Sequence, residues 1–188
     1  MRHTFWVTIG VGAMLLVACG RHGVEPGPTS GPTANAVLKK TNPLALAVDP
    51  KARFYLLVGH QIDGDGASDP DKNGYWVANY MTPDASSARQ VTILAYKVTA
   101  DGEPTLTRRE HAAIPSGYGS MAPKVPGADS SKMVLTARKS GKFQGVDVPV
   151  VKLYSPLTSQ YWGKLLYYVG DTPPDMVVLD ADTAAIAP

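Results

Sequence analysis

Cysteine is almost absent from this chain, with only Cys19 among 188 residues. A single thiol excludes an intramolecular disulfide framework. Histidine is scarce as well, with His3, His22, His60 and His111 as the four members. No HExxH motif, Walker phosphate loop or dinucleotide-binding glycine motif is present, and no second Cys or His stands at zinc-ligand spacing. The metalloprotease, nucleotide-binding and structural zinc classes therefore lack their signatures.

A strong charge of either sign is also missing. Lys and Arg number 18 against 16 Asp and Glu, and no run of Lys or Arg exceeds two residues. Domains that bind nucleic acid carry a clustered basic footprint. The sequence therefore predicts no nucleic-acid partner.

The N-terminus has a pattern of its own. Arg2 is followed by an apolar stretch from Phe5 to Ala18, and the next charged residue is Arg21. This stretch is shorter than the roughly 20 apolar residues of a spanning helix and has the length of a secretory signal core. We predict that residues 1–18 are a cleavable export signal.

Leu16-Val17-Ala18-Cys19 closes that apolar stretch. The tetrapeptide resembles the lipobox of bacterial lipoproteins at every position. The resemblance implies cleavage before Cys19, a diacylglycerol on its thiol and a fatty acid such as palmitate on the new amine. The alternative is an ordinary secretory signal in which Cys19 has no role. An unpaired thiol in an exported protein calls for a reaction that uses it, and acylation is such a reaction.

The residue after the cysteine bears on localisation. Gly20 stands where lipoproteins retained in the inner membrane carry Asp. In a host with two membranes, the resemblance therefore implies a lipid-anchored protein of the outer membrane that faces the periplasm or the cell surface.

The segment after Cys19 is rich in Gly, Pro, Ser and Thr as far as Asn35. Such a composition buries too little apolar surface to offset its ordering entropy and is typical of a linker. We predict a flexible tether over residues 19–38 and one folded domain over 39–188, a length typical of a single domain.

Short runs rich in Val, Ile, Leu and Tyr alternate with turn residues through the body, which is the pattern of strands. Strands are predicted over 54–62, 75–81, 90–99, 105–113, 132–139, 146–154 and 176–179. The predicted fold class is mainly β, as a β-sandwich or a β-rich α+β domain.

One segment of the body differs from this pattern. Residues 157–169 place Leu157, Tyr161, Leu165 and Tyr168 at helical spacing before Gly170, which favours a single helix there. The apolar run 164–169 also has the length of a strand, so the strand alternative stays open.

An acidic loop separates two of the predicted strands at residues 63–74. Carboxylate and amide oxygens on a glycine-rich loop can converge on calcium. The candidate ligands are Asp63, Asp65, Asp69, Asp71 and Asn73. Residues 69–74 resemble the first half of an EF-hand loop, and residues 63–69 resemble one thrombospondin-type calcium repeat. Tyr80 occupies the position of the final EF-hand glutamate, and a solvated turn with no ion is the alternative.

Aromatic residues provide the candidates for binding. Tyr75, Trp76 and Tyr80 follow the acidic loop, and Trp162 lies among the tyrosines near the C-terminus. Exposed Tyr and Trp anchor interfaces, whereas buried ones only pack the core. In a strand, Trp76 and Tyr80 share one face and Tyr75 takes the other.

No residue set has the pattern of a catalytic site. The sequence favours a non-enzymatic, membrane-anchored protein that binds an envelope component: an assembly or secretion partner, an inhibited protein or the cell wall. A calcium-dependent binding domain is one alternative. The weakest is a small hydrolase that uses His60 or His111, either of which fits an ordinary strand residue.

Overall fold

The structure is a computed structural model that describes residues 30–84 and 90–188. Cys19 and most of the predicted tether lie outside these residues. The elements, in chain order, are α1 (Ala34–Val48), β1 (Arg53–Ile62), β2 (Tyr75–Pro83), β3 (Gln90–Val98), β4 (Pro104–Ala113), β5 (Tyr118–Gly119), α2 (Ser130–Lys139), β6 (Val148–Pro156), the 3₁₀ turn η1 (Ser159–Tyr161), β7 (Leu166–Val169) and β8 (Val177–Asp180).

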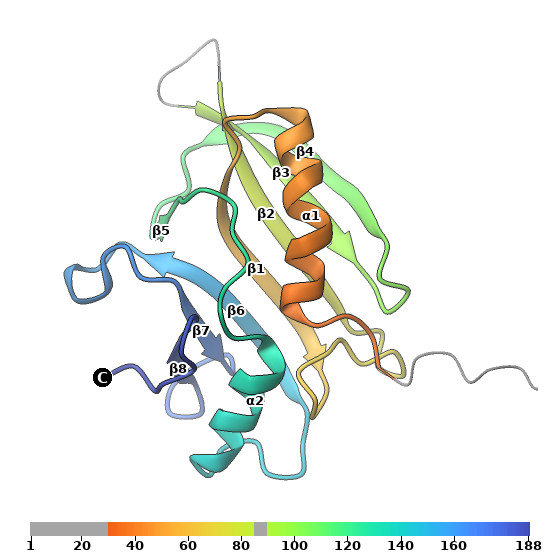
Figure 1. The fold of residues 1–188 in the computed structure, drawn as a ribbon, viewed down its shortest axis with the longest axis vertical. Helices are drawn as coiled ribbons and strands as arrows, with labels where there is room; N and C mark the ends of the chain where they lie inside the picture. Colours follow the sequence, from red (N-terminus) through yellow and green to blue (C-terminus); the bar gives the residue numbers. More distant parts are fainter. Residues whose placement is uncertain (1–29, 85–89) are drawn as a thin grey trace, which may run out of the picture.

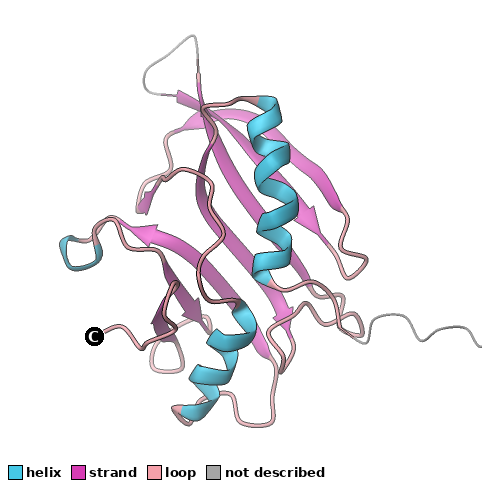
Figure 2. Ribbon diagram, in the orientation of Figure 1, coloured by secondary structure: helices cyan, strands magenta, loops and turns pink. Residues whose placement is uncertain are grey.

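The strands form one antiparallel sheet in the order β4-β3-β2-β1-β6-β7-β8, and the short β5 pairs with β6. Both helices lie on the same side of this sheet (Figures 1 and 2). The predicted mainly β single domain is confirmed, in its β-rich α+β form. Among the described residues, no helix is both long and apolar enough to cross a bilayer.

The predicted strand over 132–139 is wrong, because these residues belong to α2. Val134-Leu135-Thr136 has strand-like composition, but the buried positions Ser130, Met133, Val134 and Ala137 follow helical spacing. The side chain of Asp129 caps this helix by accepting the Ser130 N–H. The cap and the spacing together outweigh the local β-propensity.

The predicted helix over 157–169 is also wrong. The segment forms the turn η1 and then strand β7, whose four residues are all buried between β6 and β8. Gly163 separates the two parts with a φ of +74°, which a helix cannot contain. The apolar run that left the strand alternative open is therefore β7.

The fold begins earlier than the predicted tether boundary at residue 38. Helix α1 starts at Ala34 and has one buried, mostly apolar face, formed by Ala34, Val37, Leu38, Thr41, Asn42 and Ala45. Thr33 also bridges to Ala67 in the acidic loop. The Gly- and Pro-rich composition just before the helix, and the proline inside it, concealed this face in the sequence.

The core lies between the sheet and the two helices. Trp76 and Tyr80 are fully buried there, and an added Cβ on Gly59 would lie 2.5 Å from the Trp76 ring. Gly59 is thus required for Trp76 to lie flat on β1. The Trp76 indole N–H donates to the Pro32 carbonyl at 2.8 Å, which ties the chain before α1 to the sheet.

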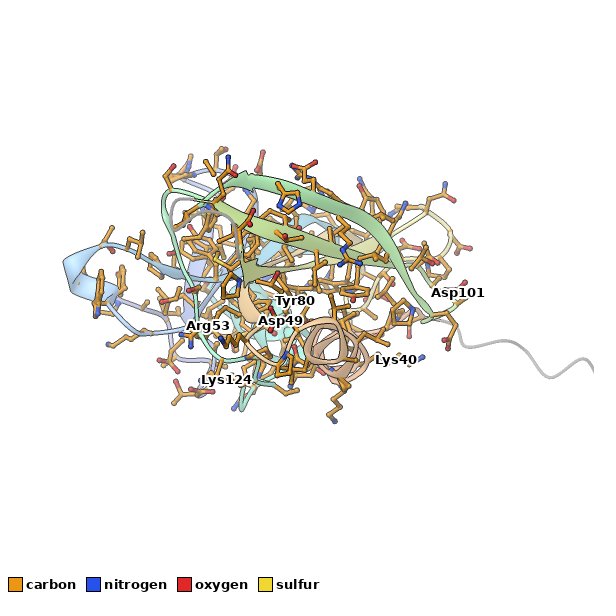
Figure 3. The ribbon with its side chains drawn as sticks, turned by 90° about the horizontal axis from the view of Figure 1, so that it is seen from above. Lys40, Asp49, Arg53, Tyr80, Asp101 and Lys124 are labelled. Atoms are coloured by element: carbon orange, nitrogen blue, oxygen red, sulfur yellow. The ribbon has the colours of Figure 1, made fainter. Side chains whose placement is uncertain are left out.

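A small polar network joins α1 to β2 within this core. The Tyr80 hydroxyl donates to Asn42 Oδ1 at 2.6 Å and lies 2.7 Å from Thr41 Oγ1. Figure 3 shows Tyr80 between the sheet and α1, with the helix seen end-on. Burial raises the pKa of Tyr80, so the phenol stays protonated and remains a donor.

One carboxylate joins the N-termini of both helices. Asp129 accepts the Ser130 N–H at 2.7 Å, the Asn35 N–H at 2.9 Å and the Thr33 hydroxyl at 2.6 Å. The N-terminal N–H groups of a helix have no partner within the helix, and the dipole of each helix favours an anion at this end. Asp129 therefore stabilises α1 and α2 together.

The neighbouring Ser130 extends this junction to the acidic loop. Its hydroxyl accepts the Ala34 N–H at 2.9 Å and donates to the Gly66 carbonyl at 2.5 Å. The start of α1, the start of α2 and the loop after β1 are thus held at one point.

The two outer strands of the sheet are protected in different ways. Along β8, the segment after it adds a bridge between Ile186 and Leu179, and the Ala187 N–H donates to the Val178 carbonyl. Strand β4 is exposed along almost its whole length and carries the charged run 108–110. Charged side chains on an edge strand disfavour pairing with another strand. The face of the sheet that the helices leave uncovered is the remaining candidate surface for an interaction.

Candidate binding face

The side of the sheet away from the helices carries a set of contacting rings. We call this surface the aromatic face and define it by Tyr55, His60, Tyr75, Tyr118, Tyr154 and Tyr168. In Figure 1, α1 and α2 both lie in front of the sheet, and this face is behind it.

Four tyrosines form a row of ring contacts across the face. The ring centroids lie 6.2 Å apart for Tyr55 and Tyr118, 5.0 Å for Tyr118 and Tyr154, and 4.4 Å for Tyr154 and Tyr168, the last pair being stacked. Aromatic pairs at these separations add about 0.5–1.5 kcal/mol beyond their burial. The row is therefore a pre-ordered surface.

Strand alternation and one irregularity place these rings. In β7, Tyr167 points into the core and Tyr168 to the aromatic face. In β1, a register shift between Phe54 and Leu56 lets Tyr55 and Leu56 both join the apolar cluster of the other face, while Phe54 and Leu57 stay in the core.

The second part of the face is both aromatic and basic. His60 and Tyr75 lie opposite each other on β1 and β2, with ring centroids 4.8 Å apart. Lys97 Nζ lies 4.1 Å from the centre of the Tyr75 ring, a cation–π contact. On the neighbouring strand β6, Lys152 pairs with Asp171 at 3.3 Å.

Burial shifts the pKa values of three groups on the face. Burial, together with the Lys152 ammonium, lowers the pKa of His60, so its imidazole is neutral. Burial raises the pKa of Tyr55 and, with the contact to Tyr154, that of Tyr168. Tyr55 and Tyr168 are buried, so the accessible groups of the face are the half-buried rings of Tyr75, Tyr118 and Tyr154 and the neighbouring lysines.

The structure divides the aromatic residues predicted for binding. Tyr75 is half-buried on the aromatic face, and Trp162 is 71% exposed on the loop between β6 and β7. Trp76 and Tyr80 are fully buried against the helices, so they pack the core and cannot reach a partner. Their placement on the opposite face from Tyr75 follows the predicted strand alternation.

The predicted binding set contained none of the other five members of the face: His60, which was a candidate only for hydrolysis, and Tyr55, Tyr118, Tyr154 and Tyr168. The ring contacts of Tyr118 with Tyr55 and with Tyr154 depend on the pairing of β5 with β6, where Tyr118 lies opposite Pro156. Period-two alternation within β6 and β7 was the available signal for Tyr154 and Tyr168. No local pattern indicated Tyr118.

The acidic loop uses several of its carboxylates to fold itself. Asp63 Oδ1 accepts the N–H groups of Asp65 and Ala67, both at 2.9 Å, and Asp69 Oδ1 accepts the Asp71 N–H at 2.9 Å. Asn73 has a φ of +55° at the end of the loop.

Lys72 supplies a cation to the same loop. Its ammonium lies 3.6 Å from Asp69 and forms an ion pair with Asp147. Within the described ranges, no three His, Cys, Asp or Glu side chains are grouped closely enough to hold a metal ion. Calcium binding by this loop stays a prediction. Calorimetric titration at millimolar calcium tests it, with Asp69→Ala and Asp71→Ala as the variants that should remove the heat.

The two histidines of the hydrolase alternative lie apart. His60 is on β1 at the aromatic face, whereas His111 is on the outer strand β4, with β2 and β3 between them. His111 Nδ1 contacts Asp84 at 2.7 Å and Thr92 at 3.4 Å. A catalytic triad needs one partner on each ring nitrogen of its histidine. Both contacts of His111 involve Nδ1, so His111, Asp84 and Thr92 do not have this arrangement.

Comparisons of this chain with protein-family models, with curated proteins and with solved structures gave no match.

Proposed function

We propose that this protein is a lipid-anchored, non-enzymatic protein of the bacterial envelope whose aromatic face binds a partner protein. The observation that carries the binding part is the uncovered side of the sheet, where contacting rings and lysines lie together. The anchor part is supported by the lipobox at Leu16–Cys19 and by Cys19 being the sole cysteine.

The sheet area behind the face reaches the lower end of the size range of specific interfaces. From β3 to β7 it crosses five strands about 4.8 Å apart, and strands of nine residues extend about 30 Å, giving on the order of 600 Å². Specific interfaces bury from about 600 Å² upward on each partner. The described cations of the face, including Lys97 and Lys152, favour a partner surface that carries carboxylates.

The experiment is affinity purification of the full lipidated chain from detergent-solubilised membranes. The double variant Tyr75→Ala/Lys97→Ala removes a half-exposed ring and the cation above it. We expect at least a tenfold loss of the recovered partner, because truncation of interface anchors costs about 2 kcal/mol or more.

The matched control is Leu135→Ala on α2, an exposed residue of the helix side. It should leave recovery unchanged. Equal recovery of the partner by the wild type and the double variant, with unchanged melting temperatures, would rule out the aromatic face as the binding surface.

A further inference from the structure

The aromatic side of the sheet carries two lysines at the ends of one row of paired residues. Lys97 on β3 pairs with Val77 on β2. Val58 on β1 pairs with Val77 on one side and with Lys152 of β6 on the other. Directly paired residues point to the same face of a sheet. We call these four residues the lysine row, and the Cα atoms of its two lysines are three strand spacings, or about 14 Å, apart.

The lysine row has an apolar floor and an aromatic border. Val58 and Val77, between the two lysines, are half-buried. Two residues further along the same strands, His60 lies opposite Tyr75, and their rings are in contact. A ligand on the row therefore meets apolar surface at its centre and a cation at each end.

The two ammonium groups are held in different ways. Lys97 Nζ lies 4.1 Å from the centre of the Tyr75 ring, and no carboxylate of the described residues pairs with it. Lys152 Nζ lies 3.3 Å from the carboxylate of Asp171, whose side chain is 63% exposed. One end of the row is therefore open to an anion, whereas the chain's own carboxylate occupies the other end.

Asp171 reaches the row from the loop between β7 and β8. The Gly170 N–H, just before it, donates to the Val150 carbonyl at 2.9 Å, and Val150 pairs with His60. This contact places Asp171 beside the aromatic border. Burial and the Lys152 ammonium lower the pKa of His60, and the Asp171 carboxylate opposes them, which agrees with this placement.

The spacing of the lysines favours an extended acidic segment of a protein as the occupant. In an extended chain, residues i, i+2 and i+4 point to the same side, and four residues span about 13–14 Å. Acidic side chains at i and i+4 match the two lysines, and an apolar side chain at i+2 matches the valine floor. Sites for anionic lipid surfaces gather about four to eight Lys or Arg, whereas this row has two, with a carboxylate beside one of them.

We infer that the lysine row binds an extended acidic segment of the partner protein, and that Asp171 is an autoinhibitory group which this segment displaces from Lys152. In the bound state, a carboxylate of the partner takes the place of the Asp171 carboxylate, and Asp171 turns to solvent on its exposed loop. The inference rests on the proposed function, because it names the chemistry of the partner that the aromatic face binds.

Surface plasmon resonance with the full lipidated chain in a neutral detergent tests the lysine row. The immobilised probe is the peptide Glu-Ser-Leu-Ser-Glu, and its isomer Glu-Glu-Leu-Ser-Ser has the same charge without the spacing. The wild type should bind the first peptide more tightly than the second. Lys97→Ala should weaken binding of the first peptide by about two- to fivefold, the range for an exposed ion pair.

Substitution of Asp171 tests the autoinhibitory contact with the same probe. Asp171→Asn should tighten binding by about two- to fivefold, because the peptide no longer has to displace an ion pair. In the Lys152→Ala background the same substitution should have little effect, since that ion pair is already lost. The matched control is Asp175→Asn, which changes the net charge equally in the same loop but pairs with Lys142. It should leave binding unchanged.

The outcomes separate this inference from the proposed function. Equal gains from Asp171→Asn and Asp175→Asn, or equal binding of the two peptides, would overturn the inference. The proposed function would still stand if Tyr75→Ala/Lys97→Ala loses the recovered partner. If that variant retains the partner, the proposed function fails, and the inference fails with it. Tighter binding of soluble short-chain phosphatidylglycerol than of Glu-Ser-Leu-Ser-Glu would identify a lipid headgroup as the ligand and would also overturn the inference.

Discussion

Replacement of Cys19 by serine should abolish incorporation of labelled palmitate and move the protein from the membrane fraction to the soluble fraction. The lipobox resemblance assigns the thiol of Cys19 as the acceptor of the diacylglycerol, and the chain has no second thiol to replace it. Each buried methylene of an acyl chain contributes about 0.8 kcal/mol to membrane binding, so loss of the chains removes the whole anchor.

A neighbouring substitution provides the control for this experiment. Gly20→Asp leaves the thiol intact, so labelling with palmitate should persist. In a host with two membranes, the resemblance implies that this variant stays in the inner membrane. Palmitate incorporation by Cys19→Ser, or membrane retention of the unlabelled variant in a carbonate wash, would contradict lipid anchoring at Cys19.

Asp129→Ala should give a large loss of stability. The carboxylate accepts hydrogen bonds from the first turns of α1 and α2 and from Thr33. Loss of a helix cap costs about 1 kcal/mol, and a hydrogen bond to a charged group contributes about 1.5–3 kcal/mol. We expect the free energy of unfolding to fall by about 3 kcal/mol and the melting temperature by about 6–12 °C.

Two further variants calibrate this result in the same thermal and urea melts. Asp129→Asn keeps an acceptor but removes the charge, and its loss of stability should be intermediate. Asp171→Ala removes a carboxylate whose side chain is 63% exposed and pairs only at the surface with Lys152, so it should cost less than about 1 kcal/mol. Equal melting temperatures for Asp129→Ala and Asp171→Ala would refute the helix junction.

The sequence predicted the central strands because their apolar residues alternate and turns separate them. Asp101-Gly102 is such a turn between β3 and β4, and Gly102 has the positive φ that hairpin turns use. Helix α2 was missed because Val134-Leu135-Thr136 favours a strand locally, whereas its helical state depends on the cap at Asp129 and on burial against β7. Tertiary contacts therefore determine that residues 130–139 are helical.

The candidate site was predictable only in part. Alternation correctly separated Tyr75 from Trp76 and Tyr80, but which side the helices cover is a property of the folded chain. The placement of Tyr118 beside Tyr154 requires the pairing of β5 with β6, and the exposure of Trp162 requires a projecting loop where a helix was favoured. Both features depend on contacts between segments distant in the sequence.

Site-specific photo-crosslinking in intact membranes is the most direct test of the central claim, that the uncovered face of an anchored domain binds a protein. A photoreactive residue at Val77, a half-buried position of β2 beside Tyr75 on the aromatic face, should yield a discrete protein adduct that excess wild-type chain competes away. The same residue at Leu135 on α2 should yield none. Adducts from Leu135 but not from Val77 would contradict the account.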